Sequence, residues 1–166
     1  MSLRTYRERC GGVNMTGFDR LLDCVGIWRG TNWLYLSPGE AADESSSVLH
    51  VMPVLGGQFV RLDQTWGFQG DPQQGSLLVG YDADSMVVTA HWIDTFHMGR
   101  KVLECTGAAG GDALEVRGSY PAPPGPDWGW RISVSGASPG QLEIVMFNIH
   151  PDGQEDLAVK ATYSPE

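Results

Sequence analysis

The stretch Gly26-Ile27-Trp28-Arg29-Gly30 marks the point where the chain changes from a helical pattern to a series of extended segments. Before it, Thr16 is placed to cap a short helix that Gly26 ends, and Asp19 lies in the first turn, where the helix dipole favours a carboxylate. The apolar residues of this helix recur at spacings of three and four, so they share one face: Phe18, Leu21, Leu22 and Val25. The stretch therefore predicts the start of the first strand, with Trp28 at its head.

Ten short extended segments fill the rest of the chain, and turns rich in Gly, Pro, Asp, Asn and Ser separate them. The 22 glycines and 10 prolines favour many turns between short strands over long helices. Because the separators leave little room for crossover helices, the pattern predicts an antiparallel meander, and closure into a barrel would remove its exposed edges. We therefore expect an all-β, up-and-down barrel behind a short N-terminal helix. The candidate strands are residues 27–36, 46–53, 57–68, 75–81, 86–93, 101–107, 113–120, 128–135, 141–149 and 155–163.

The length and composition describe one globular domain of 166 residues, of which 42% are apolar. Residues 1–14 are interpreted as an N-terminal tail and residues 15–166 as the barrel domain. The 20 acidic and 11 basic residues give a net charge of -9, which repels phosphate backbones and anionic lipids. No segment approaches the ~20 consecutive apolar residues of a membrane helix. We therefore expect neither a nucleic acid nor a membrane as a partner.

The three cysteines, Cys10, Cys24 and Cys105, have no pairable spacing, and their odd number argues against a disulfide framework. Residues 1–12 lack the apolar stretch that would mark a signal peptide. Together with reduced thiols, this predicts a cytoplasmic protein. Cys105 shares the apolar side of its segment with Leu103, so we expect it to be a small buried hydrophobic residue.

Alternation along the strands indicates which side chains face the interior of the barrel. The segments 46–53 and 86–93 are apolar on both faces, so alternation leaves their orientation open. Apolar walls with a few polar groups suit a small-molecule cavity, whereas a barrel filled by its large aromatic side chains is the alternative. The residues expected to hold a ligand, inside the barrel or at its mouth, are Trp28, Asn32, Gln64, Trp66, His91, Trp130, Asn148 and His150.

Four motifs follow one another in an order and spacing that is typical of one family. They are Leu22–Gly30, Gly56–Val60, Gly80-Tyr81-Asp82 followed by Trp92-Ile93-Asp94, and Asp152-Gly153 ahead of Tyr163. The Gly-x-Trp resembles the entry of lipocalin-like barrels, and the four motifs together resemble the bacterial DUF1579 family over about residues 18–163. The resemblance implies a lipocalin-like (calycin) barrel of ten strands and no established activity. The residues Ser164-Pro165 and the Pro-rich stretch 121–126 depart from the family pattern.

The histidines raise two questions of metal or cofactor binding. His91, Asp94 and His97 form H-x-x-D-x-x-H, a spacing that suits a divalent metal if both rings converge. Residues three apart on a strand point to opposite faces, so no metal site is expected unless the chain turns there. Nitrobindin-like barrels, which also begin with G-x-W-x-G, hold haem through one inward histidine, and this resemblance implies His150 first and His91 second as haem ligands. We expect no cofactor, and we keep a haem- or metal-binding barrel as an alternative.

Signals for catalysis are weak, and we assign no catalytic residue. No G-x-S-x-G motif is present, and Ser45-Ser46-Ser47 is interpreted as a solvated turn. The expected function is non-catalytic binding of a small apolar or amphipathic molecule in the barrel. The Pro-rich residues 121–126 with Trp128 form either a flap over one mouth or an ordinary loop. A homodimer formed through an apolar sheet face is the second hypothesis, and an enzyme is the third.

Overall fold

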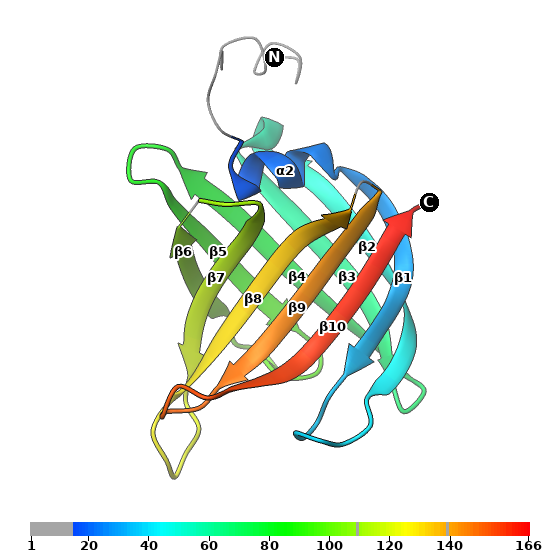
Figure 1. Ribbon diagram of the computed structural model, residues 1–166, viewed down its shortest axis with the longest axis vertical. Helices are drawn as coiled ribbons and strands as arrows, with labels where there is room; N and C mark the ends of the chain where they lie inside the picture. Colours follow the sequence, from blue (N-terminus) through cyan, green and yellow to red (C-terminus); the bar gives the residue numbers. More distant parts are fainter. Residues whose placement is uncertain (1–14, 109, 139) are drawn as a thin grey trace.

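A computed structural model describes residues 15–108, 110–138 and 140–166. The predicted N-terminal tail, with Cys10, lies outside the described residues. The strands form one closed barrel in which every neighbouring pair is antiparallel, and β1 pairs with β10 to complete the circle (Figure 1). This confirms the expected all-β, up-and-down barrel. The strands are β1 (Gly26–Leu34), β2 (Asp43–Val54), β3 (Phe59–Phe68), β4 (Asp71–Asp82), β5 (Val87–Asp94), β6 (Leu103–Ala108), β7 (Ala113–Tyr120), β8 (Trp128–Ser138), β9 (Gln141–Ile149) and β10 (Glu155–Pro165).

The helix α2 (Gly17–Asp23) lies across one end of the barrel (Figure 1). Thr16 caps it as expected: its side chain accepts a hydrogen bond from the backbone N–H of Asp19, while the Asp19 carboxylate accepts from the Thr16 backbone. Phe18 and Leu21 are buried against the barrel. Val25 lies beyond the end of the helix and is exposed, so it does not belong to the apolar face predicted for it. We call the barrel end opposite α2 the open end.

The glycine–tryptophan stretch closes the barrel at the α2 end. Trp28 is buried, and its indole N–H donates to the carbonyl oxygen of Cys24 at 2.8 Å, which joins β1 to the end of the helix. Gly30 lies opposite β10, where an added Cβ would come within 1.8 Å of the carbonyl oxygen of Thr162. The second glycine is therefore required by the close approach of the two strands that complete the barrel.

Side-chain alternation along the strands agrees with the predicted inward faces. In β3, Val60, Leu62 and Gln64 are all buried, as expected for one parity. The structure also decides the strands whose orientation was open. In β2, Leu49 and Val51 face inward. In β5, every second side chain is buried and faces inward, namely those of Val88, Ala90, Trp92 and Asp94. His91 and Ile93 therefore face outward on β5.

A β-bulge in β10 corrects part of the predicted alternation. The register with β9 shifts between Leu157 and Val159, where Ala158 is the extra residue. Before the bulge, Asp156 is paired with Asn148, so Asp156 rather than Leu157 shares the parity of Asn148. One inserted residue exchanges the two faces of a strand, and an alternating sequence does not show where the insertion occurs.

The residues Ser45-Ser46-Ser47 are also corrected, because they belong to β2 and not to a solvated turn. Ser47 is buried, and its hydroxyl donates to the carbonyl oxygen of Thr65 at 2.7 Å. Its oxygen lies 2.8 Å from the hydroxyl of Tyr163, which must be the donor because the single Ser47 proton is already used. The strand tolerates this run of small polar residues because Thr65 and Tyr163 supply hydrogen-bond partners for the buried hydroxyl of Ser47.

Candidate functional site

The deep interior of the barrel is packed. Beside Trp66 there is a void of about 10 Å³, which is the space of roughly one water molecule. The alternative of a filled barrel therefore holds for this region. The residues that line the void are Asn32, Leu34, Gln64, Trp66, Trp92, Asp94, His97, Met146 and Val159.

A larger cavity lies at the open end. Its volume is about 310 Å³, at the lower end of the range of about 300–1,000 Å³ that is typical of small-molecule sites. More than half of its lining side chains are aliphatic or aromatic. We call this cavity the cleft, and its lining residues are Trp92, His97, Met98, Lys101, Val102, Leu103, Ser119, Tyr120, Pro121, Trp130 and Asn148.

The cleft lies where the ladder between β6 and β7 ends early. These strands are registered at only two described positions, Cys105 with Gly118 and Thr106 with Arg117. Leu103 begins β6 and Tyr120 ends β7, so both lie beyond the paired region on the side of the open end. Because the two backbones are not joined there, their side chains border an open space instead of packing against each other.

The segment after β5 returns to the barrel and brings His97 onto Asp94. The Asp94 carboxylate accepts hydrogen bonds from Nδ1 of His97 at 2.9 Å, from the backbone N–H groups of His97 and Met98 at 2.7 and 2.8 Å, and from the indole of Trp92 at 3.2 Å. The Asp94 side chain is 1% exposed, whereas that of His97 is 38% exposed. A buried carboxylate thus holds a half-exposed imidazole that borders both the void and the cleft.

Asp94 stays ionised despite its burial. Desolvation raises the pKa of Asp94, but the hydrogen bonds from His97 and from the two backbone N–H groups outweigh it and leave that pKa below its usual value. An ionised carboxylate is an acceptor only, so Nδ1 of His97 must carry a proton. In the described part of the chain, Nε2 is then the one ring nitrogen of His97 without a hydrogen bond.

Three buried side-chain nitrogens have no hydrogen-bond partner among the described residues: Nδ2 of Asn32, Nε1 of Trp66 and Nε1 of Trp130. All three are donors. Asn32 and Trp66 border the small void, and Trp130 borders the cleft. An unpaired buried donor costs about 1–3 kcal/mol, so each of these groups favours a bound molecule that carries an acceptor.

The remaining polar groups of the interior are paired with one another. Nε2 of Gln64 donates to Oδ1 of Asn32 at 3.1 Å, and the Tyr120 hydroxyl donates to Oδ1 of Asn148 at 2.7 Å. Burial raises the pKa of Tyr163, although hydrogen bonds with Ser47 and Gln64 oppose this, so its phenol is neutral. Asn32 and Asn148 thus accept through Oδ1, and their N–H₂ groups take no part in these two bonds.

The predicted site residues separate into several places. Asn32, Gln64 and Trp66 border the void, while Trp130 and Asn148 border the cleft. Trp28 lies at the α2 end and borders neither, because β1 carries it away from the open end.

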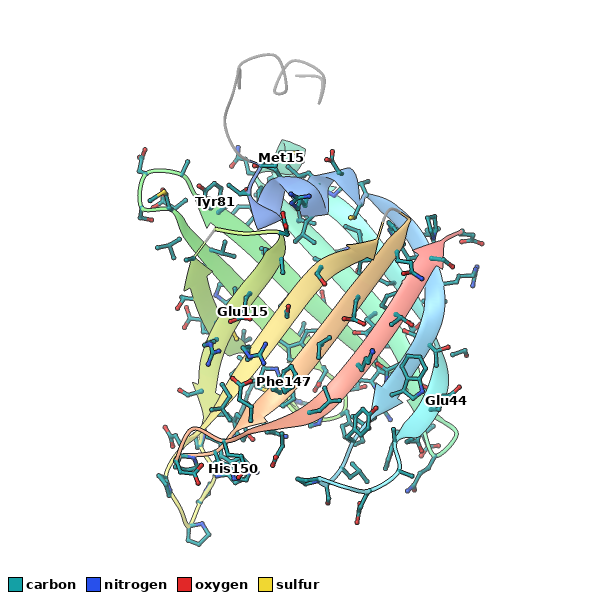
Figure 2. All side chains as sticks on the ribbon, viewed as in Figure 1. Met15, Glu44, Tyr81, Glu115, Phe147 and His150 are labelled. Carbon is teal, nitrogen blue, oxygen red and sulfur yellow. The ribbon has the colours of Figure 1, made fainter. Side chains whose placement is uncertain are left out.

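Two of the predicted histidines also lie away from the cleft. His91 faces outward and lies 3.5 Å from Glu104, because its neighbours Ala90 and Trp92 take the inward parity. His150 is at the open end, where its ring stacks on Trp128 and bonds to Asp156, but it does not line the cleft (Figure 2).

The histidines named in the metal and haem hypotheses lie in different places. Asp94 and His97 meet, but His91 is on the outer face of the barrel. Within residues 15–108, 110–138 and 140–166, no group of three His, Cys, Asp or Glu side chains is placed to hold a metal ion. The two histidines put forward for haem, His150 and His91, do not line the cleft.

The structure also places Cys105 and the Pro-rich loop. Cys105 is buried as expected, and burial raises the pKa of Cys105 to about 11, which disfavours a reactive thiolate. The loop between β7 and β8 projects beyond the open end of the barrel (Figure 1). Pro121, at its start, borders the cleft.

Of the residues that line the cleft, sequence reasoning placed only Trp130 and Asn148 in a site; among those it missed are His97, Met98, Lys101 and Tyr120. The H-x-x-D-x-x-H spacing pointed to Asp94 and His97 but suggested a metal. The sequence signal for the hydrogen bond between Asp94 and His97 is their i, i+3 spacing at the end of a strand. Where the chain turns after a strand, an aspartate can accept hydrogen bonds from the backbone N–H groups that follow it.

Comparisons with known proteins bear on the family and the fold. A family model described as "Protein of unknown function (DUF1579)" matches residues 17–164. No curated protein matches the sequence. A solved structure described as Rv2717c from M. tuberculosis is similar with a TM-score of 0.59 and 13% identity, covering 92% of this chain and 99% of that one. A redesigned β-barrel, b11L5F_LGL, has a TM-score of 0.44 and 14% identity, with coverage of 93% and 99%.

The similarity to Rv2717c supports the barrel fold, and the family description assigns no activity. At 13% identity, the similarity to the mycobacterial protein concerns the fold alone. Among the described residues, no helix has both the length and the apolar character needed to span a membrane.

Proposed function

The chain belongs to the DUF1579 family, whose description assigns no function, and we propose from the geometry of the cleft that the protein binds a small, largely apolar molecule without transforming it. The observation that carries this proposal is a space of about 310 Å³ at the open end of the barrel, whereas the void beside Trp66 holds only about 10 Å³. A protein that only needed a stable core would fill such a space with side chains.

The lining supports a ligand with a substantial apolar surface. The rings of Trp92 and Trp130 and the side chain of Leu103 form apolar walls, and all three residues are buried. Burial of about 150–200 Å² of apolar ligand surface contributes roughly 4–5 kcal/mol before the costs of association are subtracted. We therefore expect modest affinity from apolar contacts alone.

The polar groups of the cleft support binding rather than catalysis. A nucleophilic enzyme needs a serine, threonine or cysteine within hydrogen-bond reach of a base. No such side chain of the described residues is hydrogen-bonded to His97, the one imidazole that borders the cleft. Burial also raises the pKa of Tyr120, so its hydroxyl is a neutral partner of Asn148 and not a base.

The binding proposal is tested by titrating ¹⁵N-labelled protein with 2-naphthylmethanol, a neutral aromatic probe. We expect amide shifts concentrated around the cleft, in residues 96–103 and 118–121 and next to Trp92, Trp130 and Asn148. Val102 is 59% exposed and borders the cleft, so Val102→Trp should fill part of it and weaken binding at least about tenfold.

The matched control is Ile93→Trp, which adds the same side chain at a position that is 47% exposed on the outer face of β5. This variant should bind the probe like the unchanged protein. Shifts scattered over the outer face, or equal weakening by both variants, would refute the proposal.

A further inference from the structure

We propose that the cleft selects an apolar molecule that carries a carboxylate group, whose oxygen accepts a hydrogen bond from the indole N–H of Trp130 beside the ammonium group of Lys101. This inference rests on the proposed binding function and specifies the chemical class of the ligand. Three observations support it: a buried donor without a partner, a cationic lining, and the absence of a competing acid in that lining.

The buried donor is Nε1 of Trp130. This residue is 6% exposed and borders the cleft, and Nε1 has no partner among the described residues. An indole nitrogen is a donor only, so an acceptor atom alone can satisfy it. Oxygen atoms of a carboxylate, which form charge-assisted hydrogen bonds, are the strongest acceptors that a small organic molecule offers.

The charge of the lining is positive in a protein whose net charge is -9. Lys101 borders the cleft, and no Asp or Glu is among the described residues that line it. The nearest buried acid, Asp94, borders the void instead, and its carboxylate is already occupied by four N–H donors. Lys101 therefore attracts an anion to the cleft. A protonated amine would be repelled by Lys101, and no acidic side chain of the described lining would pair with it.

The other polar groups complete a site for an acceptor. The Tyr120 hydroxyl uses Oδ1 of Asn148, so the side chain of Asn148 keeps its N–H₂ group for the cleft. The His97 ring lies 5.8 Å from that of Trp130, measured between centroids, and Asp94 already holds its Nδ1.

The test compares three probes with the same ring system: 2-naphthoate, 2-naphthylmethanol and 2-naphthylmethylamine. We expect 2-naphthoate to bind about tenfold more tightly than the alcohol, because it gains a charge-assisted hydrogen bond, and the amine to bind least. The indole N–H resonance of Trp130, assigned from its absence in Trp130→Phe, should move downfield with 2-naphthoate. A structural role of Trp130 alone would leave this resonance unchanged.

A pair of surface variants separates local charge from net charge. Lys101→Gln should weaken 2-naphthoate about three- to tenfold and leave the alcohol unchanged, since an exposed charge contributes modestly. Arg100→Gln removes the same charge one residue away, at an exposed position outside the cleft lining, and should have little effect on either probe. Because both substitutions are on the surface, neither should impair folding.

The outcomes distinguish the two proposals. Equal affinity for 2-naphthoate and 2-naphthylmethanol, or equal effects of the two charge variants, would overturn the carboxylate inference and leave the binding function standing. Failure of all three probes to shift the residues of the cleft would overturn both.

Discussion

Asp94 shows how one residue at the end of a strand organises the site. Its carboxylate accepts four hydrogen bonds and thereby places the His97 ring at the border of the cleft. In Asp94→Asn, the amide N–H₂ would face donors that need an acceptor. We expect a loss of about 1–3 kcal/mol in the free energy of unfolding at pH 7, measured by urea denaturation.

The cost of Asp94→Asn should also depend on pH. The pKa of Asp94 is lower in the folded protein than the value of about 3.9 in an unfolded chain, so its ionised form stabilises the fold above that value. This contribution disappears as the pH falls through the folded pKa, so the difference between the two proteins should be constant from about pH 5 to 7 and shrink below about pH 4. A difference that persists unchanged to pH 3 would contradict the assignment. Asp112→Asn, at an exposed ion pair with Arg20, is the control and should change stability by less than about 0.5 kcal/mol.

At the scale of elements, the pairing of β1 with β10 depends on a glycine. The carbonyl oxygen of Thr162 occupies the place of a Cβ at Gly30. Gly30→Ala should therefore force the two closing strands apart and cost about 1–3 kcal/mol or more, as overpacking does. Thermal unfolding of Gly30→Ala measures this cost, with Thr31→Ala in the same strand as the control. Equal melting temperatures for Gly30→Ala and the unchanged protein would show that β10 does not approach β1 so closely.

At the scale of the whole molecule, the short β6–β7 ladder is the weak part of the closed barrel. Only two described positions are in register there, whereas every residue of β3 is paired with β4. We expect amide hydrogens of β6 and β7 to exchange with deuterium fastest among the strands, because few ladder hydrogen bonds protect them. Saturating 2-naphthoate should slow exchange in these two strands and leave β3 and β4 unchanged. Uniform exchange around the barrel would contradict this interpretation.

The homodimer hypothesis also belongs to this scale and stays a prediction. Both strands that were expected to be apolar on two faces bury one parity inside the barrel, and their outer parities carry His50, His91 and Ile93. Light scattering distinguishes a monomer of 18.0 kDa from a dimer.

Local patterns in the sequence were sufficient for the architecture. Alternation with a period of two identified the inward side chains of β3, and turn residues separated the ten strands, because both signals act between near neighbours in the chain. The Gly-x-Trp stretch likewise located the closed end, since Trp28 bonds to Cys24 only four residues away.

The site depended on tertiary structure. The cleft exists because the β6–β7 ladder stops before Leu103 and Tyr120, and the bulge at Ala158 changes which residues of β10 face Asn148. Both features are set by the register between strands, which arises from the packing and closure of the entire barrel. The sequence by itself determined a closed barrel with aromatic residues inside. Only the tertiary structure decided that Trp66 fills it while Trp130, which borders the cleft, keeps a buried N–H without a partner among the described residues, because packing density and hydrogen-bond partners come from residues distant in the chain.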